Sequence, residues 1–152
     1  MHACRKAGIK TVPALVYTID RDAAAIALVD SNLHRERILP SEKAFAYKLK
    51  MDALSRQGKR TDLTSRQVGE KLSVTQLSES SNESERQIHR YIRLTNLVPG
   101  ILEKVDEGRI ALTPAVELSY LTEAEQKDLL ETMESEDCTP SLSQAIQLKQ
   151  LS

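Results

Sequence analysis

A single stretch of this sequence, residues 11–17, has the composition of a β-strand. It reads Thr-Val-Pro-Ala-Leu-Val-Tyr, and Pro13 places it at a strand start or a sheet edge. The neighbouring segments have helical patterns, with Tyr120 expected in the core and with N-caps expected at Asp20, Ser41, Thr113 and Thr122. A strand without a partner leaves its backbone groups unpaired. The sequence therefore predicts a mainly α-helical protein that begins with a small α/β segment. We expect the partner strands to belong to a sheet that this sequence does not contain, rather than to a second chain.

The composition also favours helices and excludes several classes of protein. Aromatic residues make up 3% of the chain, with one Phe and no Trp, so the core must be aliphatic. No apolar run approaches the roughly 20 residues that span a membrane, and the first residues lack the apolar stretch of a signal peptide. Cys4 and Cys138 stand near opposite ends of the sequence and indicate neither a disulfide framework nor a zinc site. A reduced, cytoplasmic protein is the expected class.

Charge is distributed unevenly along the chain, although the formal net charge is −1. Residues 1–60 contain 12 basic and 6 acidic side chains, residues 61–100 contain 5 of each, and residues 101–152 contain 4 basic and 11 acidic. A near-neutral total therefore does not exclude a polyanionic partner for the first half. An acidic, solvated C-terminal region is the simpler alternative.

Residues 73–95 have the pattern of two short helices joined by a tight turn. The first is expected over 74–81, with Val74, Leu77 and Ser78 facing inward. Ser84 opens the second, and Gln87 three residues later is typical of a capping box. This arrangement predicts a helix-turn-helix, the unit that places its second helix in the major groove of DNA.

The second helix carries the residues that can read DNA. Arginine forms paired hydrogen bonds with guanine, glutamine does so with adenine, and basic side chains neutralise phosphates. The residues expected to point outward are Glu85, Arg86, Gln87, His89, Arg90 and Arg93. Nearby basic residues favour this interpretation: Lys43, Lys48, Lys50, Lys59 and Arg60. An ordinary helix with a solvated polar face is the alternative.

Two stretches resemble the signature of ParB-type (ParB/RepB family) partition proteins. Residues 31–36 read Ser-Asn-Leu-His-Arg-Glu and residues 40–44 read Pro-Ser-Glu-Lys-Ala. The family form is Glu-Asn-x-Gln-Arg followed by Asn-Pro-x-Glu-Glu-Ala. The segments 3–16, 84–97 and 107–118 also resemble, in order, the family's helix-turn-strand, recognition helix and following helices. The resemblance thus covers nearly the whole chain.

The resemblance implies two parts and assigns roles to residues. Residues 1–39 would be a remnant of the family's nucleotide-binding α/β domain, and residues 40–152 a helical DNA-binding domain. Asn32 and Arg35 match the family's nucleotide-contacting residues. The base-facing residues would be Arg86, Gln87, His89 and Arg90, and the phosphate-holding residues would be Gln76, Ser84 and Arg93.

This sequence departs from the family at the nucleotide site. The Gly-x-Arg-Arg motif that cradles the triphosphate would lie before Met1, so the resemblance is to an N-terminally truncated member. Ser31 replaces an acidic residue, and a hydroxyl binds Mg²⁺ less well than a carboxylate does. His34 replaces the usual glutamine. We therefore expect no CTP hydrolysis, weak or absent nucleotide binding, and no catalytic residue, metal or cofactor in this chain, although CTP and Mg²⁺ are implied for the family.

The function expected on these grounds is sequence-specific binding of a palindromic double-stranded DNA site in chromosome or plasmid partition. We expect a homodimer, formed through the N-terminal segment by exchange of the exposed strand, and a cytoplasmic, nucleoid-associated location without a membrane. The resemblance implies a ParA-type ATPase partner. Two alternatives stay open. One is a switch that still binds or hydrolyses CTP, and the other is a helical protein-interaction module or transcriptional regulator.

Overall fold

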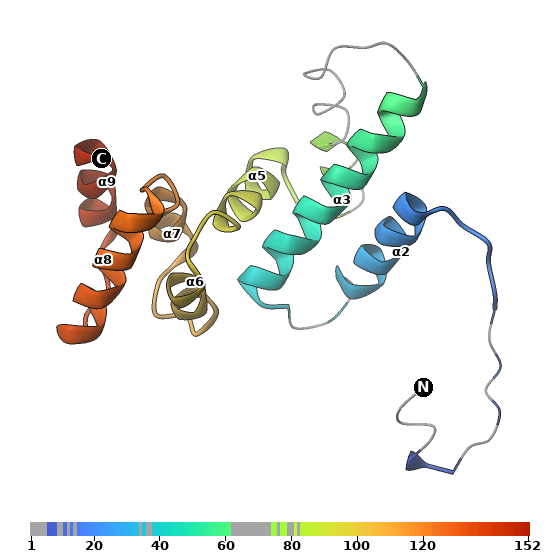
Figure 1. Cartoon of the computed structure of the whole chain (residues 1–152), viewed down its shortest axis with the longest axis horizontal. Helices are drawn as coiled ribbons and strands as arrows, with labels where there is room; N and C mark the ends of the chain where they lie inside the picture. Colours follow the sequence, from blue (N-terminus) through green and yellow to red (C-terminus); the bar gives the residue numbers. More distant parts are fainter. Residues whose placement is uncertain are drawn as a thin grey trace.

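The structure is a computed structural model that describes residues 6–8, 11, 13, 15–33, 35, 38–61, 74–75, 77–78, 81 and 83–152. The described residues are mainly helical and contain no strand, which confirms the predicted class. The helices are α2 (Arg21–Leu33), α3 (Pro40–Thr61), α5 (Glu85–Leu94), α6 (Pro99–Asp106), α7 (Leu112–Leu118), α8 (Glu123–Ser135) and α9 (Leu142–Leu151). Helices α2 and α3 pack together at one end, and α8 and α9 lie at the other (Figure 1).

The strand expected over residues 11–17 is not formed in its described residues, 11, 13 and 15–17. Leu15 and Val16 expose 84% and 92% of their surface, and the segment extends away from α2 (Figure 1). The prediction of a strand was wrong for these residues because none of the described residues forms a neighbouring strand that could supply the hydrogen-bonding partners of an extended backbone.

Side-chain caps define several helix ends as the sequence predicts. Asp20 accepts a 2.7 Å hydrogen bond from the Ala23 backbone at the start of α2. Thr122 opens α8 with a full capping box, in which Thr122 and Glu125 each bond the other's backbone N–H. Gly108, with a φ of +75°, follows the end of α6 in the left-handed conformation that glycine adopts most readily.

Two predicted caps were wrong. Helix α3 begins at Pro40, so Ser41 lies inside it, and the Ser41 hydroxyl donates to the distant Asp106. Helix α7 has Ala111 as its N-cap rather than Thr113. In both cases the hydroxyl is engaged by a residue of another helix, Asp106 of α6 for Ser41 and Arg90 of α5 for Thr113.

Two apolar clusters hold α3 and α5 in place. A small cluster joins Tyr47 of α3, Leu77 and Ile88 of α5, and each is at most 2% exposed. A larger cluster, to which Leu94 of α5 belongs, extends through α6, α7, α8 and α9. Helix α5 therefore contributes its inner face to both clusters and keeps its outer face free. No described helix combines the length and the apolar character needed to cross a membrane.

Candidate nucleic-acid interface

The N-terminus of α5 is fixed by two local contacts. The Ser84 hydroxyl accepts a hydrogen bond from the Gln87 backbone N–H at 3.3 Å, as the sequence predicts for an N-cap. The reciprocal half of the predicted capping box is not present, because the Gln87 side-chain oxygen accepts from Arg90 Nη1 at 3.4 Å. Glu85 accepts a 2.7 Å hydrogen bond from Thr75, which ties the helix to the segment before it.

The helix has a buried face and an exposed face, as its sequence predicts. Ile88 and Leu94 are fully buried, whereas Glu85, Arg86 and His89 are exposed. The segment before α5 is described at residues 74–75, 77–78 and 81, all of which are helical, and Val74 and Leu77 are buried. Gln76, a predicted phosphate contact, lies outside the described residues.

A shallow hollow of about 510 Å³ lies between α3, α5 and the end of α7. Its described lining residues include five basic side chains and no acidic one: Lys48, Arg86, His89, Arg90 and Arg93. Three helices contribute to this basic hollow, and four of its five basic residues come from α5. An anion with an extended shape would meet cations along one wall and few opposing charges.

These five basic residues form no ion pair with a carboxylate in the described part of the chain. Most other described cations do form one. The paired cations are Lys43, Lys50, Arg56, Lys104, Arg109, Lys127 and Lys149. Among the lysines at positions 43, 48 and 50 of α3, Lys43 and Lys50 are therefore neutralised by Glu83 and Asp30. Lys48 alone among them lines the basic hollow.

Two arginines of the hollow are held by neighbouring groups. Arg90 Nη2 donates to the Thr113 hydroxyl at 2.5 Å. Arg93 is half-buried, and its Nη2 lies 3.4 Å from the Ser119 carbonyl oxygen. Arg86 and His89 are exposed and have no such partner in the described part of the chain. The hollow thus combines two arginines held in position with two exposed basic side chains.

The sequence named Lys48 only among the nearby basic residues and did not place Tyr120 at this surface. Lys48 is exposed, and its Nζ lies 3.3 Å from the Thr95 hydroxyl beyond α5. Tyr120, expected in the core, is 47% exposed and lines the hollow. Lys48 stands 38 residues before Arg86 in the sequence, so only the packing of α3 on α5 could bring them together. The sequence around an aromatic residue that follows a short helix does not indicate whether the ring lies in the core or at the surface.

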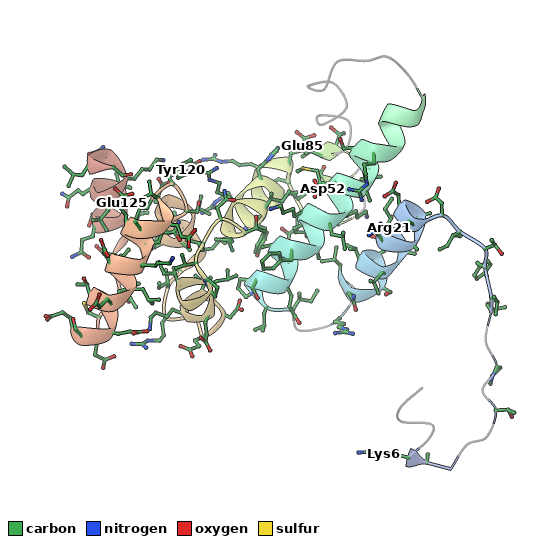
Figure 2. The ribbon with its side chains drawn as sticks, in the orientation of Figure 1. Lys6, Arg21, Asp52, Glu85, Tyr120 and Glu125 are labelled. Atoms are coloured by element: carbon green, nitrogen blue, oxygen red, sulfur yellow. The ribbon has the colours of Figure 1, made fainter. Side chains whose placement is uncertain are left out.

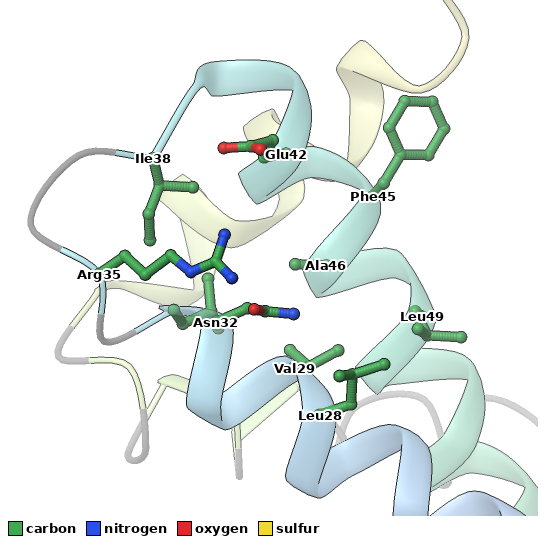
Figure 3. A pocket seen from close by; sticks show the side chains of 10 residues that line it. Leu28, Val29, Asn32, Arg35, Ile38, Glu42, Phe45, Ala46 and Leu49 are labelled. Carbon is green, nitrogen blue, oxygen red and sulfur yellow. The ribbon is translucent and has the colours of Figure 1, made fainter. Parts of the chain in front are cut away.

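Asn32 and Arg35, the predicted nucleotide contacts, lie at a different hollow between α2 and α3. It measures about 360 Å³, and both side chains extend toward α3 beside Glu42 (Figure 3). Most of the other lining residues are apolar, and Phe45 and Leu49 are exposed at its edge. Among the described residues that line it, Arg35 is the one cation, so this part of the hollow differs in charge from the basic hollow on α5.

Comparisons with known proteins find similar solved structures but no similar sequence. No family model matches the chain, and no curated protein matches its sequence. Its structure is similar to that of the C-terminally truncated chromosome-partitioning protein ParB from Caulobacter crescentus, solved in complex with the centromeric parS site. The match covers 99% of this chain and 70% of that chain, with a TM-score of 0.59 and 19% identity. The chain therefore has a ParB-type fold, as the sequence resemblance predicts.

Proposed function

We propose that this protein binds double-stranded DNA sequence-specifically, as a ParB-like partition protein does. The observation that carries the proposal is the basic hollow along α5, where five basic side chains face one surface without a carboxylate partner in the described residues. Neutralisation of backbone phosphates supplies most of the affinity of proteins for DNA. The structural likeness to a ParB bound to parS supports the same function.

In this proposal residues 73–95 form a helix-turn-helix, and α5 enters the major groove. The base-facing residues are Arg86, Gln87, His89 and Arg90, which can hydrogen-bond the edges of bases. Ser84, Lys48 and Arg93 contact phosphates at the two margins of the helix. Gln87 and Arg90 hydrogen-bond each other, so this pair is arranged before DNA arrives and less conformational entropy is lost on binding.

A palindromic site requires two copies of α5 about one helical turn of DNA apart, roughly 34 Å. We therefore propose that the DNA-bound form is a homodimer in the cytoplasm, on the nucleoid. A ParA-type ATPase partner follows from the family resemblance and belongs to the same proposal. Each of these points depends on DNA binding, which is the first property to test.

The decisive experiment is selection of bound duplexes from a random DNA pool at several salt concentrations, followed by sequencing. We expect a palindromic enriched site and an affinity that falls steeply with salt. Arg86→Ala should then cost about 1–3 kcal/mol on the enriched site and far less on random DNA. Lys127→Ala is the matched control, because Lys127 is an exposed cation on α8, paired with Glu123 and distant from the hollow in sequence. Absence of binding at low salt would contradict the proposal and favour a helical interaction module.

The hollow at Asn32 and Arg35 is a second candidate site, for a nucleotide. The specific observation is that an amide and a guanidinium share one hollow (Figure 3). The described lining residues do not fit a nucleoside triphosphate, however, because Arg35, the one cation among them, and the acidic Glu42 cannot balance its charge. We therefore propose that CTP binds here weakly or not at all and is not hydrolysed. Isothermal titration with CTP and Mg²⁺ tests this, and binding below millimolar concentration that Arg35→Ala abolishes would contradict it.

A further inference from the structure

Two cations from different helices lie over the ring of Tyr120. Arg93 Cζ, at the end of α5, is 3.9 Å from the ring centroid, and Lys149 Nζ of α9 is 3.8 Å from it. Figure 2 shows Tyr120 between α5 and α9. Both distances are well within the range at which the electron-rich face of an aromatic ring attracts a cation. The ring therefore connects the helix proposed to read DNA with the C-terminal helix.

The two cations differ in how their charge is balanced. Lys149 Nζ lies 2.8 Å from a carboxylate oxygen of Glu117, so its charge is neutralised within the protein. Arg93 has no carboxylate partner in the described part of the chain. Its Nη2 approaches the Ser119 carbonyl at 3.4 Å, and its Nε is buried without a hydrogen bond. Arg93 is thus fixed in position while its charge stays available to an outside anion.

We infer that Tyr120 is a positioning residue of the DNA surface, which holds the Arg93 guanidinium at the edge of the basic hollow for one backbone phosphate. The inference rests on the proposed function and adds a residue to it. A guanidinium presents its donors in a fixed plane, and a ring stacked against that plane determines where the donors point. Because less side-chain freedom remains to be lost, the contact with a phosphate becomes stronger.

Lys149 connects the Tyr120 ring to the C-terminal helix α9. Its ion pair with Glu117 and its contact with Tyr120 hold α9 against α7 and its following turn. The position of Arg93 is therefore linked to the docking of α9, and the C-terminal helix belongs to the DNA-binding unit. A ring that served only to pack α9 would affect stability and leave the dependence of DNA binding on salt unchanged.

The test measures the affinity of the whole chain for a random-sequence duplex over a range of salt concentrations. For Tyr120→Leu we expect a loss of about tenfold near 0.1 M salt and a salt slope smaller by about 0.9, the value for one phosphate contact. Arg93→Ala should give the same change, and the double variant should lose no more than either single variant. Tyr120→Phe keeps the ring and should bind like the parent. Tyr120→Met provides a second ring-free side chain if the leucine variant does not fold.

The outcomes separate this inference from the proposed function. A folded Tyr120→Leu or Tyr120→Met chain with the parent's affinity and salt slope would overturn the inference alone. Additive losses in the double variant would also overturn it, because they would show that Tyr120 and Arg93 act independently. A parent chain that binds no duplex even at low salt would overturn the proposed function and this inference together.

Discussion

Ser41 and Asp106 are 65 residues apart in the sequence and are joined by two hydrogen bonds. The Asp106 carboxylate accepts from the Ser41 backbone N–H at 2.9 Å and from the Ser41 hydroxyl at 2.5 Å. The last residue of α6 thus satisfies a free donor in the first turn of α3 and places a negative charge where the helix dipole favours it. This contact fixes the start of α3 relative to the helices around α5. The position of Lys48 on the basic hollow depends on that placement.

Asp106→Ala should destabilise the protein by about 1–2 kcal/mol, the usual cost of a lost helix cap. Urea unfolding followed by circular dichroism measures the change. Asp128→Ala is the matched control, since Asp128 is an exposed carboxylate on α8. Equal stability of the two variants would show that the link between Asp106 and Ser41 contributes nothing.

Gln126→Leu should destabilise the protein more than Asp106→Ala does. The Gln126 side chain is 2% exposed, accepts from the Val98 N–H at 2.8 Å, and donates to the carbonyls of Asn96 and Leu121 at 3.2 and 3.0 Å. Leucine would leave these groups unpaired in the interior, at a cost of about 3 kcal/mol. Chemical unfolding measures the loss, with the exposed Gln150→Leu as control. A loss below about 1 kcal/mol would contradict the structural role of Gln126.

Alkaline pH should weaken the contact between α3 and the start of α5. Burial is the largest single effect on Lys43 and opposes its charge. The hydrogen bond to Glu83, together with the nearby charges of Tyr91, Glu83 and Tyr47, outweighs burial and raises the pKa of Lys43 above its ordinary value of 10.5. Burial raises the pKa of Tyr47 above 10.0. In both cases the folded chain holds the proton more tightly than the unfolded chain. The stabilisation is therefore complete below about pH 10 and is lost as pH rises through the folded pKa values.

Glu83→Gln tests this alkaline effect. Glutamine can still accept a hydrogen bond from Lys43, but it lacks the charge that helps to raise both pKa values. We expect the stability of this variant to fall less between about pH 9 and about pH 11 than that of the parent. Urea unfolding at each pH gives the slopes, and Lys127→Met, which removes an exposed cation, serves as the control. Identical slopes for Glu83→Gln and the parent would refute the prediction.

Lys48→Ala should weaken binding to every DNA sequence by a similar factor. Lys48 is exposed beside Thr95 and faces the basic hollow without a carboxylate partner in the described residues. The salt slope should decrease by about 0.9, the value for one phosphate contact. Fluorescence anisotropy with enriched and random duplexes measures both quantities, and Lys127→Ala again serves as the control. A loss confined to the enriched site would instead assign Lys48 to base reading.

Local sequence patterns determined the helical class and most helix ends. Asp20, Ser84 and Thr122 cap helices as predicted, because a short polar side chain satisfies backbone donors two or three residues away. Helix α5 buries an apolar face with Ile88 and Leu94 and exposes a polar face with Arg86 and His89. This division follows from the spacing of apolar residues at the helical repeat. These features depend on residues within one or two turns of each other, so the sequence alone could specify them.

The tertiary structure decided which charges are free and which are neutralised. Lys43, Lys48 and Lys50 look alike in the sequence, but Glu83 and Asp30 pair with the first and the third. The residues next to Tyr120 in the sequence do not distinguish it from a core tyrosine. It lies at the surface beneath Arg93 of α5 and Lys149 of α9 because these two helices pack around it. Ion pairs and ring contacts join residues far apart in the chain. The packing of the helices therefore decides which residues pair, and a local sequence pattern cannot predict it.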